Sequence, residues 1–142
     1  MPNTEINFSE SDIKKNIKLP QRTTMNLAEE VGLHIGDGTM NFYAQNNKLM
    51  GKYSLRGHIL DDREHYLERV RLIYKSVYNL DVSLKQMESS GVFGFQTWSN
   101  AIVEFKQRTI GLPLGKKYEV CIPKKFLIDQ ELSISVLRGI YD

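Results

Sequence analysis

The feature that most constrains this sequence is a short predicted helix that carries two glycines one turn apart. Its apolar face combines two neighbouring rows at four-residue spacing: Leu27, Val31 and Ile35, and beside them Ala28, Gly32 and Gly36. A glycine inside a helix costs about 1 kcal/mol relative to alanine, so a pair of them implies a compensating gain. The gain we expect is close approach of a second backbone along this face. We therefore predict a helix–helix interface made by Ala28, Gly32, Ile35 and Gly36.

Both ends of this predicted helix carry residues that favour a helix boundary. Asn26 is the predicted N-cap, with Glu29 as its reciprocal partner in a capping box. Gly38 is expected to adopt the left-handed conformation that ends a helix. Asp37 is thereby held at a helix end, beside whatever packs against the glycines.

Composition limits the possible classes of protein. The chain has 142 residues, enough for one domain with a core, and its 41% hydrophobic and 25% charged content is ordinary for a soluble globular protein. A net charge of +2 neither announces nor excludes a nucleic-acid binder. Cys121 is the only cysteine, which excludes a disulfide framework and a thiolate zinc site and favours a reducing, cytoplasmic compartment. No apolar run approaches the roughly 20 residues that span a bilayer, and the polar start lacks a signal-peptide core, so no membrane partner is expected.

The rest of the chain predicts two β-hairpins that alternate with helices. The first hairpin joins strands at 39–44 and 52–59, and the second joins strands at 82–87 and 92–98. Further helices are expected after Asp61 or Asp62, from Ser99 to Gly111, and from Phe126 to Asp142. This order predicts an α+β fold with an antiparallel sheet backed by helices. The arm at 1–25 is polar and locally basic, which fits either a solvated lead-in or a contact with a DNA backbone.

With this order established, residues 30–38 resemble the signature of the LAGLIDADG homing endonuclease family. They match it at its two small positions and at its closing acid and glycine: Gly32, Gly36, Asp37 and Gly38. Glu30 and His34 depart from the usual apolar choices, and Ile35 replaces an acidic residue that is often present.

The end of the chain extends this resemblance. Residues 137–142 resemble the first six residues of a second signature. Three short pieces resemble the family's linker between repeats: Gly111-Leu112-Pro113, Gly115 with Lys117, and Ile122-Pro123. We interpret the chain as a polar arm (1–25), one repeat (26–122) and the start of a second repeat (123–142) of a two-repeat, single-chain member.

The resemblance implies an α-β-β-α-β-β-α unit with a four-stranded, saddle-shaped sheet, in which two signature helices pack together and their terminal acids bind divalent metal. Asp37 matches the acid, the Gly36 carbonyl lies beside it in sequence, and Lys117 matches a basic residue near the scissile phosphates. Mg²⁺ prefers carboxylate and phosphate oxygens, and metal ions stabilise charge during phosphodiester cleavage. We therefore expect Asp37 and Lys117 to be catalytic and Asp37 and Gly36 to bind Mg²⁺. The simpler alternatives are that Asp37 only closes a helix and that Lys117 is a solvated loop residue.

A polar, cation-bearing face is predicted on the sheet. Along 52–59, donors and cations alternate with core residues, and a β-ribbon of this kind can enter the major groove. The candidate DNA contacts are Lys52, Ser54, Arg56, His58, Lys85, Gln96 and, in the basic loop, Lys116. An ordinary solvent face would show much the same alternation. We expect His34 to be a packed or partly exposed helix residue, and Trp98 and Phe93 to be core residues rather than base-stacking platforms.

Three hypotheses for function remain open at this stage. The first is a Mg²⁺-dependent, site-specific endonuclease for double-stranded DNA, encoded within an intron or intein. The second is a cleavage-inactive member that binds DNA or RNA as a maturase or transcription regulator, and the third is an inert folded fragment. One chain supplies one signature acid, so the partner of Asp37 must come from a second repeat or from a second copy of the chain.

Overall fold

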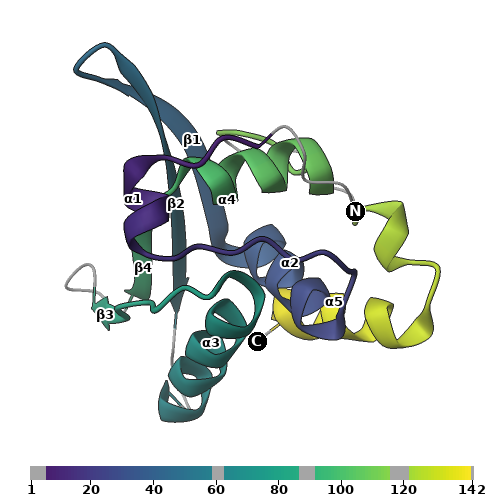
Figure 1. The fold of residues 1–142 in the computed structure, drawn as a ribbon. Coiled ribbons are helices and arrows are strands. Elements are labelled where there is room, and N and C mark those ends of the chain that lie inside the picture. The colour runs from purple at the N-terminus through teal and green to yellow at the C-terminus, as the bar shows by residue number, and fades with distance from the viewer. Residues whose placement is uncertain (1–5, 59–62, 87–91, 116–121, 142) are drawn as a thin grey trace.

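The computed structural model describes residues 6–58, 63–86, 92–115 and 122–141, and it shows helices packed on one face of an antiparallel sheet (Figure 1). The elements, in chain order, are α1 (Glu10–Lys14), α2 (Met25–Asp37), β1 (Gly38–Gln45), β2 (Lys48–His58), α3 (Arg63–Tyr78), β3 (Lys85–Gln86), β4 (Val92–Trp98), α4 (Asn100–Glu104), the π-helical turn η1 (Phe105–Ile110), the 3₁₀ turn η2 (Lys124–Phe126) and α5 (Gln130–Tyr141). The predicted α+β architecture is confirmed. Within these described ranges, no helix combines the length and apolar character needed to cross a membrane.

The sheet has the strand order β1-β2-β4-β3, with three long strands and the two-residue β3 at one edge. The strand predicted at 82–87 is therefore shorter than expected, because Val82 and Leu84 pack against the core before β3 begins. On β2, Tyr53 and Leu55 are buried against the helices, and the residues between them belong to the opposite, outer face of the sheet. The saddle shape of the resembled family stays a prediction.

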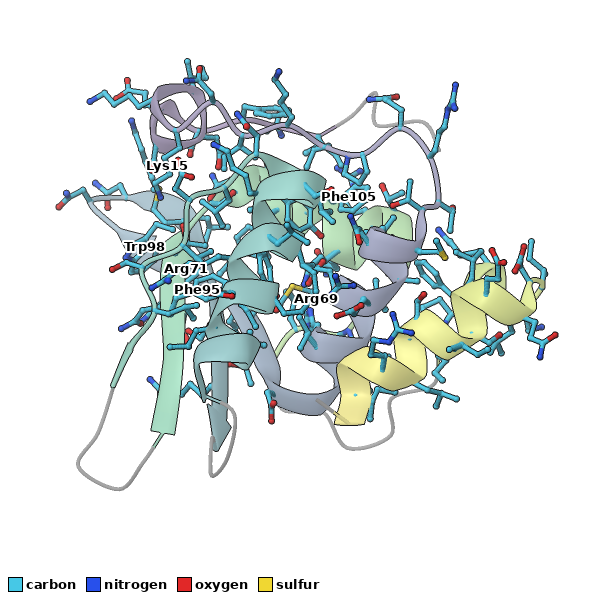
Figure 2. All side chains as sticks on the ribbon, turned by 90° about the horizontal axis from the view of Figure 1, so that it is seen from below. Lys15, Arg69, Arg71, Phe95, Trp98 and Phe105 are labelled. Carbon is cyan, nitrogen blue, oxygen red and sulfur yellow. The ribbon has the colours of Figure 1, made fainter. Side chains whose placement is uncertain are left out.

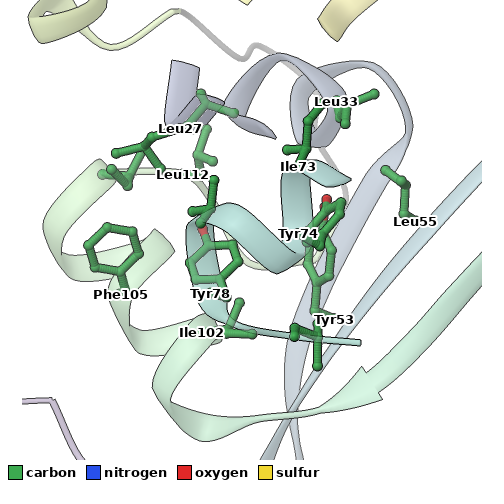
Figure 3. Packing of buried hydrophobic residues seen from close by; sticks show 14 of the residues in the cluster. Leu27, Leu33, Tyr53, Leu55, Ile73, Tyr74, Tyr78, Ile102, Phe105 and Leu112 are labelled. Carbon is green, nitrogen blue, oxygen red and sulfur yellow. The ribbon is translucent and has the colours of Figure 1, made fainter. Parts of the chain in front are cut away.

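One hydrophobic core lies between the helices and the sheet (Figure 3). Most of its largest apolar and aromatic members come from α2, α3, β2 and the α4–η1 segment, and Leu112 and Phe126 add to them: Leu27, Leu33, Tyr53, Leu55, Ile73, Tyr74, Tyr78, Ile102 and Phe105. The polar arm also reaches this core, because Ile17 is buried and the backbone N–H of Lys18 donates to the carbonyl of Tyr78 at 3.0 Å. Burial of one such aliphatic side chain stabilises the fold by about 1.5–3 kcal/mol, which ties the arm to the domain.

The start of α2 differs from the sequence prediction. Thr24 is the N-cap, and its hydroxyl accepts from the N–H of Leu27 at 3.1 Å. Asn26 instead donates its side-chain amide to Ser76 on α3 at 2.9 Å. The N-cap therefore lies two residues earlier than predicted, and the predicted cap residue makes a tertiary contact.

The end of α2 also differs. Gly38 has φ −91° and ψ 150°, which is extended and not left-handed, because it begins β1 opposite Leu55. Its N–H donates to the carbonyl of His34, so the helix passes directly into the sheet. Asp37 is thereby fixed at a helix-to-strand junction.

The glycines of α2 lie against α5, and the contact is reciprocal. A Cβ at Gly32 would stand 2.1 Å from the carbonyl oxygen of Val136, and a Cβ at Gly139 would stand 2.1 Å from the carbonyl oxygen of Glu29. Gly32 therefore contacts Val136, three residues before Gly139, and Gly139 contacts Glu29, three residues before Gly32. Such reciprocal contacts are those of two helices related by a local twofold axis. A Cβ at Gly36 would stand 3.0 Å from the carbonyl oxygen of Ile140, so the helices run in the same direction. We call this contact the glycine seam.

The glycine seam predicts a graded response to alanine. Gly32→Ala places its methyl group on the Val136 carbonyl, so we expect a loss of about 3 kcal/mol in the free energy of unfolding. Gly36→Ala would place its methyl group 3.0 Å from the Ile140 carbonyl oxygen, a tight contact that a shift of a few tenths of an ångström relieves. Because alanine also gains helix propensity, we expect a smaller loss than at Gly32, of about 1 kcal/mol. Urea unfolding measures both variants, and equal stability of the two would contradict the close approach at Gly32.

Candidate metal and nucleic-acid site at the end of helix α2

Asp37 opens into a hollow of about 450 Å³ on the outer face of the sheet. We call it the Asp37 hollow, and its lining residues are Asp37, Thr39, Met40, Asn41, Tyr43, Lys52, Ser54, Arg56 and Gly115. It brings together four residues that the sequence analysis singled out: Asp37, Lys52, Ser54 and Arg56. The strand register explains this, because β1 leaves the end of α2 and pairs along β2 from Gly38 opposite Leu55.

The third long strand extends the same face. Gln96 is exposed and lies opposite Ser54, and Trp98 lies opposite Lys52. Trp98 is therefore on the outer face, not in the core as expected. Its ring makes an edge contact with Tyr43 at 6.1 Å between centroids, and the Lys52 ammonium stands 5.4 Å from its centroid. Sequence parity along β4 would have placed Trp98 with Gln96 on this face.

The other predicted site residues have mixed positions. The backbones of His58 and Lys85 lie in β2 and β3, opposite Val92 and Gly94, and their side chains lie outside the described part of the structure. Lys116 and Lys117 fall entirely outside the described residues, so their roles stay predictions. On α2, Ala28 is buried and Ile35 packs against the core beside the glycine seam.

The donor chemistry at Asp37 fits half of a shared metal site. In the ranges that the structure describes, no cluster of three or more His, Cys, Asp or Glu side chains is arranged to hold a metal ion. Mg²⁺ keeps several waters and is often bound by one or two carboxylates together with substrate phosphates. The partly exposed carboxylate of Asp37, with the Gly36 carbonyl before it, fits that mode better than a closed protein cage.

A buried ion pair lies beneath this end of α2. Lys106, on η1, donates to the Glu30 carboxylate, and both side chains are fully buried. The Lys106 ammonium also stands 3.0 Å from Nδ1 of His34 and 4.0 Å from the centre of the Tyr53 ring. An ammonium has no acceptor, so His34 Nδ1 accepts and the neutral ring carries its proton on Nε2. The two departures from the signature, Glu30 and His34, thus meet at one buried cation.

Three tyrosines complete this network. The Tyr78 hydroxyl donates to one carboxylate oxygen of Glu30, and the Tyr74 hydroxyl donates to the other at 3.1 Å. Because the Tyr74 proton is used there, Tyr53 donates to the Tyr74 oxygen at 2.6 Å. Burial, together with the neighbouring Glu30 carboxylate, raises the pKa of Tyr74 and of Tyr78 well above the ordinary value of 10.0.

A second carboxylate joins three helices. Glu29, 1% exposed, accepts from Arg69 of α3 at 3.0 and 2.7 Å, and Arg138 of α5 approaches it at 3.8 Å. This bidentate contact from Arg69, which is labelled in Figure 2, holds α3 to α2 beside the glycine seam.

Comparison with solved structures identifies the fold. The chain has the fold of the homing endonuclease I-DmoI. Its structure matches that of I-DmoI in complex with DNA and Mn with a TM-score of 0.55 and 12% identity, covering 84% of this chain and 62% of that one. Mesophilic variants of I-DmoI match with a TM-score of 0.56 and 12% identity, over 84% of this chain and 60% of theirs. The chain thus spans about three-fifths of the I-DmoI chains.

Sequence comparison is less specific. No protein-family model matches the chain. It is 25% identical over 144 residues to a glutamine–fructose-6-phosphate aminotransferase (isomerizing) of Methanocaldococcus jannaschii, a match that covers 96% of this chain and only 12% of that protein.

The buried ion pair predicts a strong asymmetry between single and double variants. Lys106→Met leaves the Glu30 carboxylate buried without its cation, so we expect a loss of about 3–5 kcal/mol in the free energy of unfolding. Adding Glu30→Gln removes the stranded charge and keeps an acceptor for the tyrosines, so the double variant should recover part of that loss. Urea unfolding of the wild type, the two single variants and the double variant tests this prediction. If the losses in the two single variants simply add in the double variant, Lys106 and Glu30 are not coupled.

The tyrosines predict alkaline sensitivity. Their pKa values are raised in the folded state, so their contribution is fully present below about pH 10 and is lost as pH rises, because only the unfolded chain ionises. Each tyrosine adds a slope of about 1.4 kcal/mol per pH unit to the stability above that point. Tyr78→Phe should remove one such slope in urea unfolding at rising pH. Tyr43→Phe, which removes an exposed tyrosine, is the control, and an unchanged slope in Tyr78→Phe would refute the assignment.

Proposed function

We propose that this chain is part of a LAGLIDADG-type homing endonuclease that cleaves double-stranded DNA with a divalent metal ion. One observation carries the proposal: the signature acid, Asp37, opens into the same hollow as Lys52 and Arg56 of the outer sheet face. The I-DmoI fold and the divalent metal and DNA in its complexes support it. A metal-binding carboxylate beside a cationic face is the arrangement that phosphodiester hydrolysis on a polyanion requires.

The outer face of the sheet is suited to a DNA groove. Lys52 and Arg56 supply positive charge for phosphates or for guanine edges, and Ser54 and Gln96 supply hydrogen-bond donors and acceptors in the next row. Because strands alternate, these groups lie on one side while the core residues between them hold the sheet against the helices. We propose that the face sits in the major groove, with Asp37 at one end of the contact.

The metal would be held by Asp37 and the Gly36 carbonyl together with a substrate phosphate. Bound there, Mg²⁺ would supply charge stabilisation for the attacking and leaving oxygens. The protein's own contribution is to fix the Asp37 carboxylate at the junction of α2 and β1, where helix and sheet hydrogen bonds hold the backbone on both sides. Lys117 stays our candidate for a cation near the scissile phosphate.

The glycine seam favours a second repeat over a second copy as the partner of Asp37. In this chain α5 already covers Gly32 and Gly36, and a symmetric dimer through α2 would have to displace it. The reciprocal contacts of Gly32 and Gly139 support α5 as the second signature helix. We propose that, in a two-repeat enzyme, α5 is the second signature helix and pairs with α2 through this seam.

The alternative is a cleavage-inactive nucleic-acid binder, such as a maturase or regulator. The observation that favours it is that Asp37 is the single carboxylate among the residues lining its hollow. Such a protein would use the same sheet face without needing the metal. An intron or intein origin stays a prediction under either alternative.

Asp37→Asn separates the two functions. The test incubates the chain with Mg²⁺ and a plasmid library of target sites and measures both cleavage and DNA affinity. We expect the variant to lose cleavage by about a hundredfold or more, because a metal ligand supplies several kcal/mol, and to keep its DNA affinity.

The control is Asp81→Asn, an exposed acid that pairs only with Lys75 among the contacts described. It should leave cleavage unchanged. If the wild-type chain binds DNA but nicks no site, the endonuclease proposal fails for this chain and the binding alternative stands.

A further inference from the structure

The N-terminal helix α1 is locked to the rest of the molecule by one buried carboxylate. Asp12 is fully buried and accepts from the backbone and hydroxyl of Ser9, both at 2.9 Å, which caps α1. It also accepts from the Ser99 hydroxyl and from the N–H of Ala101 at 3.0 Å, which caps α4. One side chain therefore satisfies the starts of two helices, and the lysines that follow it on α1 have a fixed base.

These lysines border a second hollow, of about 600 Å³, between α1, the start of β2 and α4. We call it the arm hollow, and its lining residues are Ser9, Glu10, Ser11, Lys14, Lys15, Lys48, Leu49, Met50 and Asn100. The lining carries three ammonium groups, those of the exposed residues Lys14, Lys15 and Lys48, and one carboxylate, that of Glu10. The hollow is thus net cationic, and Leu49 and Met50 contribute apolar surface to its wall beside the cations.

Lys15 is held in place as a cation by neutral oxygens. Its ammonium donates to the Thr97 hydroxyl at 3.0 Å and to the Trp98 carbonyl at 3.1 Å. Partial burial lowers the pKa of Lys15, and the nearby Asp12 carboxylate offsets part of that effect. Two of its three donors are used, so the geometry orients the group and leaves one donor for an anion.

Trp98 connects the arm hollow to the Asp37 hollow. Its carbonyl binds Lys15, which lines the arm hollow, and its ring faces Lys52, which lines the Asp37 hollow. Figure 2 shows Lys15 and Trp98 side by side at the end of the sheet. Lys48 and Lys52 are four residues apart on β2 and share its outer face. Lys15 itself binds at the edge of β4, because the Thr97 hydroxyl that it contacts lies opposite Tyr53, on the core side of the sheet. The lysines of the two hollows therefore form a cationic track that passes around the β4 edge at Trp98.

The strand geometry sets the length of this track. Lys48 lies seven residues along β2 from Leu55, the residue opposite Gly38. At about 3.3 Å per residue Lys48 lies roughly 23 Å from the Asp37 end, or about seven base pairs at 3.4 Å each. Lys15 lies nearer, because its partners Thr97 and Trp98 stand opposite Tyr53 and Lys52. That is about three residues from Leu55, or roughly 10 Å and three base pairs.

We propose that Lys14, Lys15 and Lys48 form a backbone clamp for the phosphates of a DNA duplex, about three to seven base pairs from the Asp37 hollow. The inference rests on the proposed function only in assuming that duplex DNA lies along the outer face. The clamp contacts phosphates and not bases, so it adds affinity for any sequence and leaves the cleavage step alone.

The test compares DNA binding by the wild-type chain and by Lys14→Gln/Lys15→Gln across a range of salt concentrations. We expect the dissociation constant to rise about tenfold for every sequence, and the slope of log affinity against log salt to fall by about 1.8 for two lost phosphate contacts. Phosphate ethylation about three base pairs from the cleavage site, where Lys15 lies, should weaken binding of the wild-type chain and not of the variant. The cleavage rate at saturating DNA should not change.

The matched control is Lys18→Gln/Lys124→Gln, because both lysines are exposed and border neither hollow. Circular dichroism confirms that both double variants fold. An unchanged dissociation constant and salt slope in Lys14→Gln/Lys15→Gln, or equal effects in the control, would overturn the clamp. Tighter, lysine-dependent binding of RNA than of duplex DNA would overturn the assigned partner. If the wild-type chain binds no DNA at all, the proposed function itself fails.

Discussion

The position of α2 depends on the buried ion pair between Lys106 and Glu30. Taking two charges out of water is expensive, and such a pair is tolerated only when the remaining hydrogen bonds are satisfied. Tyrosine hydroxyls from α3 and the ring of His34 meet that condition here. Because the partners come from α2, α3 and η1, these hydrogen bonds form together in only one arrangement of the three elements. A shift of α2 would leave buried polar groups unpaired, at about 1–3 kcal/mol each, so the network indirectly fixes Asp37 against the sheet.

The glycine seam adds a second constraint of a different kind. The two backbones pack so closely that the contact tolerates no added side chain, since a single Cβ at Gly32 or Gly139 would overlap a backbone carbonyl. Glu29 reinforces it by joining Arg69 of α3 and Arg138 of α5 on the edge of the same contact. The ion pair thus orients α2 toward the core, and the seam orients it toward α5. A helix held on both sides can present the carboxylate at its end with little freedom, which a metal site shared with a substrate requires.

The parts of this structure that sequence predicted are those with a local signal. Two glycines one turn apart indicated a close helix contact, and alternation along β2 separated a core face from a cationic face. The buried network had no such signal as a whole, because Lys106 and Glu30 are residue types that usually lie at the surface. A partial signal existed, since Glu30 and His34 occupy the apolar stripe of α2 one turn apart and Lys106 follows directly on buried Phe105. The caps were missed for another reason: tertiary partners and strand pairing, which sequence does not reveal, decided the ends of α2.

Under the proposed function, the two hollows would divide the work of a site-specific DNA enzyme, and the arm would belong to the binding surface. Sequence can be read only by groups that reach base edges, and on the outer face these are the short polar side chains between the cations. Affinity comes mainly from phosphates, and it is best supplied at a distance where it does not disturb that reading. The arm provides such a place, because Asp12 fixes α1 rigidly to α4 at the far end of the sheet from Asp37. A polar arm that looked like a solvated lead-in in the sequence would then be a structural part of that surface.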